Sequence, residues 1–306
     1  MASSTKLPQG LIDLLNQAQR LRRKGYRGRF APSPTGPLHL GNLRTALISW
    51  LRARLKSGEW LLRIDDLDTP RNRAGAIESI QSDLHWLGLD WDGPMIVQSQ
   101  RRELYENVLS AFKLQGKVYP CRCTRSALAE INRSESKNFI YPGTCRSLRI
   151  PWSMQDGRLP SLRLIVDKEF SSKCGDVVLR RADGYIAYHL ATAADEMFLG
   201  INEVVRGNDL ASARHFQLAI IDSLGQKPLS YLHVPLFLND DGTKLSKREQ
   251  GIGLENLRLK GMSSEDVIGY LASSLDLVPT GSSLTAEELL KELRKSQSLI
   301  EKVLLP

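Results

Sequence analysis

The stretch RFAPSPTGPLHLGN, residues 29–42, decides the fold. Residues 29–31 have the character of a short strand, and the proline-rich residues 32–37 form a rigid loop. Apolar residues then recur at helical spacing from Leu43 to Trp50 and Leu51, and Gly58 stands where such a helix ends. The order strand, loop, helix predicts an α/β unit.

The junction between this loop and helix suits a phosphate. A helix N-terminus presents free N–H groups and a partial positive charge, and Gly41 lets a ligand approach the backbone closely. His39 stands at the helix mouth, where it can donate a hydrogen bond to a phosphate oxygen. The alternative is a proline-rich turn that leads into an ordinary amphipathic helix. The sequence has no Walker loop and no G-x-G-x-x-G fingerprint.

The overall composition is that of a globular protein with a basic surplus. The 306 residues are 42% hydrophobic and 25% charged, which excludes wholesale disorder and fibrous repeats. No stretch has the roughly 18 apolar residues of a membrane span. The net charge of +8 favours an anionic partner, either nucleic acid or a polyphosphate.

Residues 1–25 form a basic arm. Leu11, Leu14, Leu15 and Ala18 recur at helical spacing, so we expect a short amphipathic helix from Pro8 to Lys24. The arm is either a solvated leading helix or an organelle-targeting segment. Its scarcity of acidic residues is typical of a targeting segment. We expect a cytoplasmic protein and leave organelle targeting open.

Three carboxylates crowd the end of the next apolar strand, which covers residues 61–64. Ligands of open α/β sheets bind outside the carboxyl ends of strands, so Asp65, Asp66 and Asp68 are placed to hold an ammonium group or a divalent cation. In the alternative, Asp68 or Thr69 caps a helix that starts near residue 70.

Arg206 ends another β-branched strand and precedes Gly207. Its guanidinium can grip a carboxylate through two parallel hydrogen bonds, although a surface ion pair is the alternative. Further along, DDGTKLSKR at residues 240–248 has the composition of a turn carrying lysines. Lys244 and Lys247 can stabilise negative charge on a bound ligand, and a solvated basic loop is the alternative.

A thiol cluster predicts a metal site. Cys121, Cys123 and Cys145 can supply three corners of a tetrahedral zinc site, but the spacing alone does not fix a fourth ligand. Free structural cysteines are the alternative. Cys174 lies outside the motif and is expected to be a small buried hydrophobe.

Four segments in the same order resemble the signatures of the glutamyl-tRNA synthetases, which are class I enzymes. They are residues 29–42, 62–68, 204–209 and 244–248, the last resembling the KMSKS loop. The resemblance covers about residues 27–250 and implies a Rossmann-like doubly wound parallel α/β sheet. It implies a catalytic role for His39, Lys244 and Lys247, and ATP binding by His39, Gly41, Asn42 and Lys247.

The resemblance also implies a glutamate pocket. Arg29 and Arg206 would hold substrate carboxylates, Asp65 the α-ammonium group, Ser33 would add a hydroxyl, and Tyr188 would wall the pocket. The whole implied set is Arg29, Phe30, Ala31, Pro32, Ser33, Asp65, Tyr188 and Arg206. Two fixed arginines suit a doubly anionic ligand, which glutamate is and glutamine is not. The family usually has Glu where this chain has Asp65, so the pocket geometry departs from the pattern.

The sequence further resembles a shorter paralogous family, the glutamyl-Q tRNA(Asp) synthetases. The C-x-C…Y-x-x-x-C pattern of their zinc ligands matches Cys121, Cys123, Tyr141 and Cys145. Only residues 249–306 follow the KMSKS-like loop, too few for the helical anticodon-binding region of a full glutamyl-tRNA synthetase. This resemblance implies activation of L-glutamate by ATP and magnesium without tRNA, then transfer to queuosine in the anticodon of tRNA(Asp).

Two alternatives stay open: a truncated glutamyl-tRNA synthetase that charges a tRNA 3′ end, and a non-catalytic RNA-binding paralogue. The domain prediction follows the same resemblance, with a monomer favoured and no membrane partner. It comprises the arm at 1–25, a catalytic domain in two halves at 26–115 and 180–245, a structural zinc insertion at 116–179, and a small C-terminal helical subdomain within 246–306.

Overall fold

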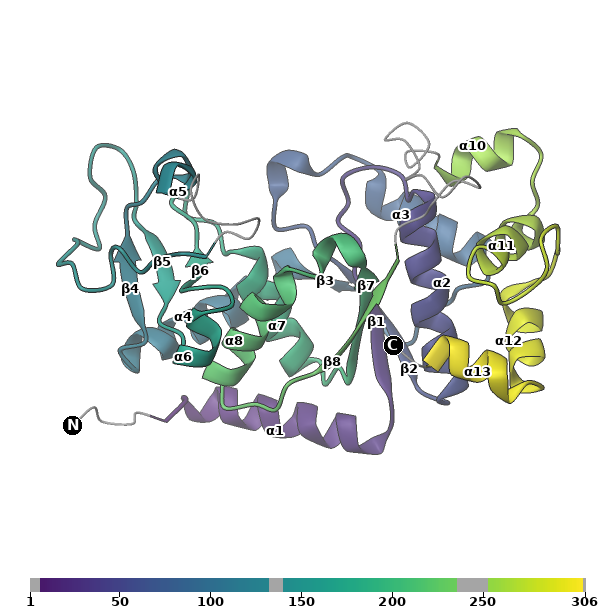
Figure 1. The fold of residues 1–306 in the computed structure, drawn as a ribbon, viewed down its shortest axis with the longest axis horizontal. Coiled ribbons are helices and arrows are strands. Elements are labelled where there is room, and N and C mark those ends of the chain that lie inside the picture. The colour runs from purple at the N-terminus through teal and green to yellow at the C-terminus, as the bar shows by residue number, and fades with distance from the viewer. Residues whose placement is uncertain (1–5, 132–139, 236–252, 305–306) are drawn as a thin grey trace. The chain divides into compact units, whose positions relative to one another are not determined.

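The computed structural model describes residues 6–131, 140–235 and 253–304, and the chain forms two compact units. The first unit comprises Met1–Gln19, Ser99–Gly200 and Ser212–Pro228. The second comprises Arg20–Gln98, Ile201–Ala211 and Leu229–Pro306. Figure 1 labels the helices and strands of both units.

The second unit is built on parallel strands. One ladder joins β1 (Arg27–Phe30), β2 (Glu59–Ile64) and β3 (Ile96–Val97), and another joins β7 (Glu203–Gly207) and β8 (Ser230–Val234). β7 packs beside β1, so the spatial order runs β3, β2, β1, β7, β8. The order reverses between β1 and β7, as in doubly wound sheets. The predicted parallel α/β class is confirmed.

Helix α2 (Leu40–Leu55) is the centre of this unit and confirms the helix predicted after the proline-rich loop. It packs on β1, β2 and β7 and is buried along nearly its whole length, from Leu43 to Ala53. Its buried positions include the polar side chains of Arg44, Thr45, Ser49 and Arg52 as well as apolar ones, so the helix is covered on all sides. In Figure 1, α11 (Ser264–Ser273), α12 (Ala286–Arg294) and α13 (Gln297–Leu304) lie against the side of α2 away from β7.

The C-terminal helices and α10 (Leu254–Leu259) belong to the second unit, and the separate helical subdomain stays a prediction. The capping box expected at the start of α12 is present: Glu288 N–H donates to Thr285 Oγ1 at 3.1 Å, and Thr285 N–H donates to Glu288 Oε2 at 2.8 Å. Elsewhere in the second unit, α3 spans Ala76–Trp86. The helix expected near residue 70 is only a 3-10 turn, Thr69–Arg71, and the Asp68 carboxylate accepts a hydrogen bond from Arg71 instead of capping it.

The first unit contains a small antiparallel sheet of β4 (Val118–Cys121), β5 (Ser161–Leu164) and β6 (Val177–Arg180). Its helices are α4 (Arg102–Leu114), α5 (Arg125–Ile131), α6 (Lys168–Ser171), α7 (Tyr188–Phe198) and α8 (Ala213–Ser223). The sheet falls almost wholly within the segment 116–179, and the compact unit also includes α4, α7 and α8. The domain boundaries drawn from the sequence stay a proposal.

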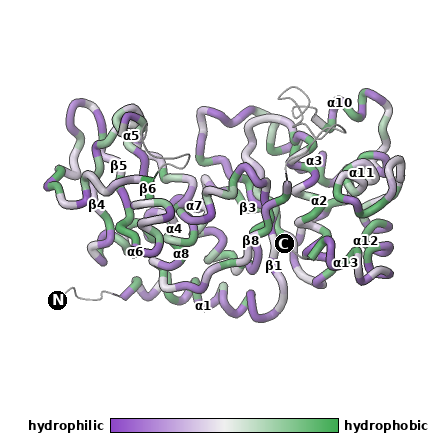
Figure 2. The backbone as a smooth tube through the Cα atoms, in the orientation of Figure 1, coloured by the Kyte–Doolittle hydropathy of each residue, from purple (hydrophilic) through white to green (hydrophobic). Residues whose placement is uncertain are grey.

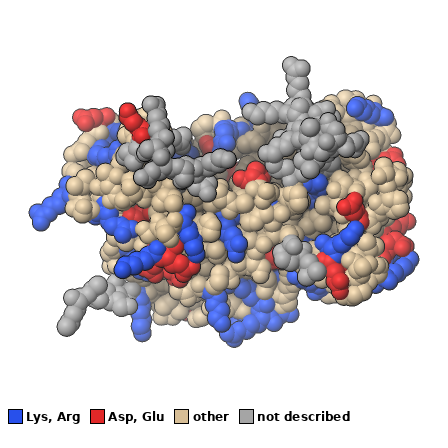
Figure 3. Space-filling model, viewed as in Figure 1, with Lys and Arg blue, Asp and Glu red and all other residues tan. Residues whose placement is uncertain are grey.

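Helix α1 spans Gln9–Lys24, which confirms the predicted leading helix. It buries Leu11, Leu15 and Ala18 along one stripe, while Figure 2 shows it as mostly hydrophilic. Figure 3 shows Lys and Arg side chains gathered along α1, whose last turn carries Arg22, Arg23 and Lys24. None of the helices in the described ranges is long and apolar enough to cross a bilayer.

A buried charge network fastens α2 to the strands. Arg52 donates from Nε to Glu203 Oε2 at 2.6 Å and from Nη2 to Oε1 at 2.5 Å, and Tyr26 donates to Oε2 at 2.7 Å. Arg52 also donates to the carbonyl of Val303 in α13. Burial tends to raise the pKa of Glu203, but the hydrogen bonds from Arg52 and Tyr26 outweigh it and lower that pKa.

We expect Glu203→Gln to destabilise the protein by about 3 kcal/mol, because it leaves a guanidinium buried without its carboxylate. Because the pKa of Glu203 is lower in the folded protein than in the unfolded chain, its ion pair gives its full stabilisation at pH values above the unfolded pKa of about 4.3. It is lost as pH falls through the folded value, so the difference between wild type and variant should shrink below about pH 4. Denaturant unfolding at several pH values measures the difference in the free energy of unfolding between wild type and variant. Glu301→Gln, an exposed site on α13, is the control; an equal effect of both would contradict the prediction.

Candidate functional site

The predicted site residues of the second unit meet at the carboxyl ends of β1, β2 and β7. The loop after β1 is tied to the end of β2 by a hydrogen bond from Asp65 N–H to Pro32 O at 3.0 Å. Arg73 N–H donates to Pro34 O at 2.8 Å, which holds the same loop further along. Since the strand order reverses between β1 and β7, this edge is the place where doubly wound sheets bind ligands.

His39 is the N-cap of α2, as the sequence suggested. Its Nδ1 accepts from Asn42 N–H and its own N–H donates to Asn42 Oδ1, both at 3.4 Å. An accepting Nδ1 assigns the ring proton to Nε2, which is then the donor toward a ligand. A Cβ on Gly41 would stand 3.2 Å from the imidazole, so glycine at this position leaves room for the ring.

The imidazole is kept neutral by its surroundings. His39 is exposed overall, but the protein around the ring withdraws enough water to lower its pKa, and the carboxylate of Asp209 opposes that shift. Asp209 in turn lies tightly against Gly207, where an added Cβ would meet Asp209 Oδ1 at 2.4 Å. At neutral pH the site therefore offers a neutral hydrogen-bond donor at the helix mouth.

Arg29 is buried and bridges the two central strands. Its Nη1 donates to the carbonyl oxygen of Val205 at 2.9 Å, so a β1 side chain is fastened to β7. Its neighbour Phe30 is also buried and stacks on Trp60, with ring centroids 6.2 Å apart, which makes the Phe30 side chain a core residue. In the loop that follows, Pro32 is buried, Ala31 is partly exposed and Ser33 is exposed.

Arg206 is held by two aromatic rings of β8. Its Nε donates to His233 Nε2 at 3.3 Å, and its guanidinium lies 5.0 Å from the centroid of the Tyr231 ring. Tyr231 and His233 are stacked, with centroids 6.1 Å apart. Sequence reasoning missed both rings, because only the parallel register that sets His233 beside Arg206 brings them to this edge.

Asp65 has a partner that the sequence did not indicate. Arg63 donates from Nε to Asp65 Oδ1 at 2.6 Å and from Nη2 to Oδ2 at 3.1 Å, and the Arg63 side chain is fully buried. The pair fixes the carboxylate in one orientation. A carboxylate oxygen accepts more than one hydrogen bond, so this orientation still permits an ammonium group to approach.

The remaining predicted residues are Tyr188, Lys244 and Lys247. Tyr188 belongs to the first unit, where it starts α7, is 39% exposed and meets the ring of His189 edge-on at 5.5 Å. Lys244 and Lys247 lie outside the described residues, with the rest of the KMSKS-like loop.

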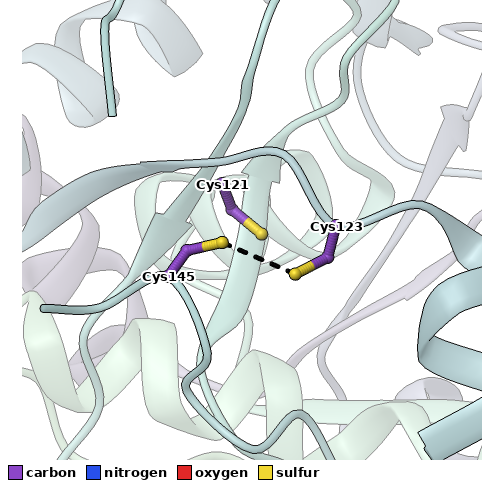
Figure 4. Close-up of side chains that lie close together, drawn as sticks. All are labelled: Cys121, Cys123 and Cys145. Atoms are coloured by element: carbon purple, nitrogen blue, oxygen red, sulfur yellow. Dashed lines mark hydrogen bonds between the residues drawn. The ribbon is translucent and has the colours of Figure 1, made fainter. Parts of the chain in front are cut away.

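The four predicted metal ligands come together in the first unit. The thiols of Cys121, Cys123 and Cys145 lie within 4.8 Å of one another, and Figure 4 shows them converging on a common centre. Cys123 Sγ and Cys145 Sγ are 3.5 Å apart. Tyr141 Oη lies 3.4 Å from Cys121 Sγ and 3.8 Å from Cys123 Sγ, and it accepts from Cys145 N–H at 3.0 Å. Three converging thiols with an adjacent phenol are a donor set that fits a metal ion.

Two residues missed by the sequence analysis support this cluster. The Arg163 guanidinium lies 3.7 Å from the centroid of the Tyr141 ring and donates to the carbonyl of Asp176 at 2.7 Å. The fully buried Asp176 carboxylate accepts from Tyr119 at 2.7 Å and from Arg146 at 2.8 Å. These contacts tie the ligand-bearing loop to β4, β5 and the start of β6.

The surroundings of the two thiols of the C-x-C motif shift their pKa values in opposite directions. Burial raises the pKa of Cys121, but hydrogen bonds from Tyr141 and Arg163 outweigh it and set that pKa at about 7. Burial and the neighbouring Cys145 raise the pKa of Cys123 to about 11. Burial also raises the pKa of Tyr141 well above its usual range. Cys174 is buried and lies outside the cluster, as expected.

Comparisons with known proteins identify the family of the chain. Residues 26–274 match the family model of the class I tRNA synthetases (E and Q), catalytic domain. The glutamyl-Q tRNA(Asp) synthetase of Prochlorococcus marinus (strain MIT 9303) is 59% identical over the full length of both chains. That of Symbiobacterium thermophilum is 40% identical and covers 86% of this chain and 90% of the relative.

A solved structure is similar at lower identity. The glutamate tRNA ligase of Elizabethkingia meningosepticum, in complex with its amino acid, aligns with a TM-score of 0.71 and 26% identity. The match covers 87% of this chain and 64% of that one. By the family model and the full-length relatives, the chain belongs to the class I tRNA synthetases of the E and Q type, within the glutamyl-Q tRNA(Asp) synthetase family.

Proposed function

We propose that the chain activates L-glutamate with ATP and transfers the glutamyl group to queuosine in the anticodon of tRNA(Asp). The observation that carries the first step is the pair of buried guanidiniums, Arg29 and Arg206, on adjacent strands at the ligand-binding edge of the sheet. The names of the full-length relatives carry the choice of RNA.

The dicarboxylic substrate follows from charge. Two fixed guanidiniums match two carboxylates, and the carboxylate of Asp65 is oriented by Arg63 to receive the α-ammonium group. Glutamate carries all three complementary charges at neutral pH. We place Ser33 and the backbone of residues 30–32 beside it, and Tyr188 as a wall of the pocket.

Activation needs no protein nucleophile. The α-carboxylate of glutamate attacks the α-phosphorus of ATP in line, a new P–O bond forms, and pyrophosphate leaves with the electrons of the broken one. In our proposal His39 Nε2–H, with the backbone at Gly41 and Asn42, binds the phosphates, and Lys244 and Lys247 stabilise the charge that develops. Mg²⁺ accompanies the ATP and offsets phosphate charge.

Transfer uses the adenylate as the electrophile. A ring hydroxyl of queuosine attacks the activated carbonyl, AMP leaves, and the hydroxyl proton passes to solvent or to the leaving phosphate. Positioning and electrostatics therefore account for catalysis in both steps. The insertion's thiols and Tyr141 would hold a structural zinc ion, which contributes folding energy to its segment and no chemistry to the reaction.

The test of the whole proposal is transfer of radiolabelled glutamate to three RNAs: queuosine-containing tRNA(Asp), unmodified tRNA(Asp) and tRNA(Glu). We expect labelling of the first alone, because the other two lack the accepting ring hydroxyl. Pyrophosphate exchange with glutamate should proceed without any tRNA. Labelling of tRNA(Glu) at its 3′ end, or exchange that requires tRNA, would indicate an ordinary glutamyl-tRNA synthetase instead.

Arg206→Ala should reduce kcat/KM for glutamate in pyrophosphate exchange by about 100-fold, since a buried charged partner of a carboxylate is worth 2–5 kcal/mol. Arg206→Lys should recover only part of the loss, because an ammonium group cannot make the bidentate contact. Arg71→Ala, which removes a highly exposed guanidinium paired with Asp68, is the control. Unchanged kinetics of Arg206→Ala would rule out this pocket.

Cys121→Ser should lower the zinc content of the purified protein from about one ion per chain and lower its thermal midpoint. Cys174→Ser changes a buried thiol of the same unit outside the cluster and should keep the ion. Elemental analysis after exhaustive dialysis gives the stoichiometry. A wild-type protein that is purified and reconstituted without binding zinc would contradict the metal site but not the enzyme.

A further inference from the structure

A loop of the first unit exposes three large apolar side chains. Within residues 146–158, Leu148 is 56% exposed, Trp152 is 47% exposed and Met154 is 60% exposed. Single exposed apolar residues are ordinary on protein surfaces, but several on one loop mark a surface that contacts a partner. The proposed catalysis does not use this loop.

The loop is held in a fixed shape. Arg122 donates from Nη1 to Arg158 O at 3.2 Å and from Nη2 to Ser153 O at 2.9 Å. The tip is closed by two backbone hydrogen bonds between Gln155 and Arg158, and by Asp156 and Gly157 at φ values of 50° and 70°. Positive φ at both central residues is typical of a tight two-residue turn. A surface already ordered loses little entropy on binding.

The charge around Trp152 is positive. Lys113 Nζ lies 5.7 Å from the centroid of its ring, and Arg149 and Arg158 are exposed on the same loop. Asp156 is the one acidic residue in the sequence from 146 to 158.

The thiol cluster anchors the root of this loop. Cys145 immediately precedes it, Leu148 N–H donates to Cys145 O at 3.2 Å, and Ile150 packs against the cluster. Arg146 is fixed by the buried carboxylate of Asp176. Whatever stabilises the cluster therefore also positions Trp152 and its neighbours.

We propose that the loop 146–158 contacts the RNA substrate, with Trp152 stacking on an unpaired base and Arg149 and Arg158 meeting phosphates. An indole among cations suits RNA, because unpaired bases stack on aromatic rings while the backbone is anionic. A second copy of the chain packed through the same loop would bring the same positive charge and be repelled. The inference rests on the proposed function only in taking the anticodon stem-loop as the RNA, because that loop displays unpaired bases.

The experiment measures binding of a labelled tRNA(Asp) anticodon stem-loop over a range of salt concentrations. Trp152→Ala should weaken binding about 5- to 100-fold without changing the salt dependence, and Trp152→Phe should restore most of it. Arg158→Ala should instead reduce the slope of log affinity against log salt by about 1. Leu114→Ala removes a 73% exposed apolar side chain at the end of α4 and is the matched control; it should bind like wild type.

Thermal melting shows whether each variant is folded, and Trp152→Phe and Arg158→Ala test the proposal even if Trp152→Ala does not fold. Unchanged affinity of folded Trp152→Ala overturns it, as does wild-type protein that binds no stem-loop. Loss of a wild-type dimer in Trp152→Ala with RNA affinity intact would assign the loop to self-association. Wild-type pyrophosphate exchange is measured in parallel, because its absence refutes the proposed activation while leaving the RNA contact standing.

Discussion

The hydrogen bond from the Arg29 guanidinium to the carbonyl of Val205 ties β1 to β7 at the point where the strand order reverses. The rest of the candidate site depends on this tie. It sets the carboxyl ends of two strands that are far apart in the sequence side by side, and it buries a cation beside the edge where we propose that the substrate binds. Arg206, on the second of these strands, is then brought to the same edge by its aromatic neighbours on β8.

Each unit contains a buried carboxylate whose hydrogen bonds hold neighbouring elements together. In the second unit, Glu203 receives Arg52 and Tyr26, so α2 cannot slide along the sheet without exposing an unpaired ion. In the first unit, the Asp176 carboxylate accepts hydrogen bonds from Tyr119 and Arg146. These bonds fix the loop that carries the Cys145 thiol. Rigid support of this kind is what a ligand-binding edge and a metal cluster both require.

Much of the fold could be predicted because local signals agree with it. The proline-rich loop before α2, the amphipathic stripe of α1 and the capping box at Thr285 and Glu288 are each decided by residues close in sequence. The grouping of Cys121, Cys123, Tyr141 and Cys145 could be predicted only through resemblance, since spacing alone left the fourth donor open. The partner of Asp65 was missed, although the two-residue period of a strand places Arg63 on the same face as Asp65.

The sequence by itself determined the α/β class, the helix mouth at His39 and the chemical character of the site, because those depend on residue type and local order. Only the tertiary structure decided which groups are neighbours. Tyr231 and His233 flank Arg206 through strand register, Arg163 covers the Tyr141 ring, and Asp176 is wholly enclosed. Contacts between residues distant in the chain are fixed by packing and burial, which no local pattern specifies.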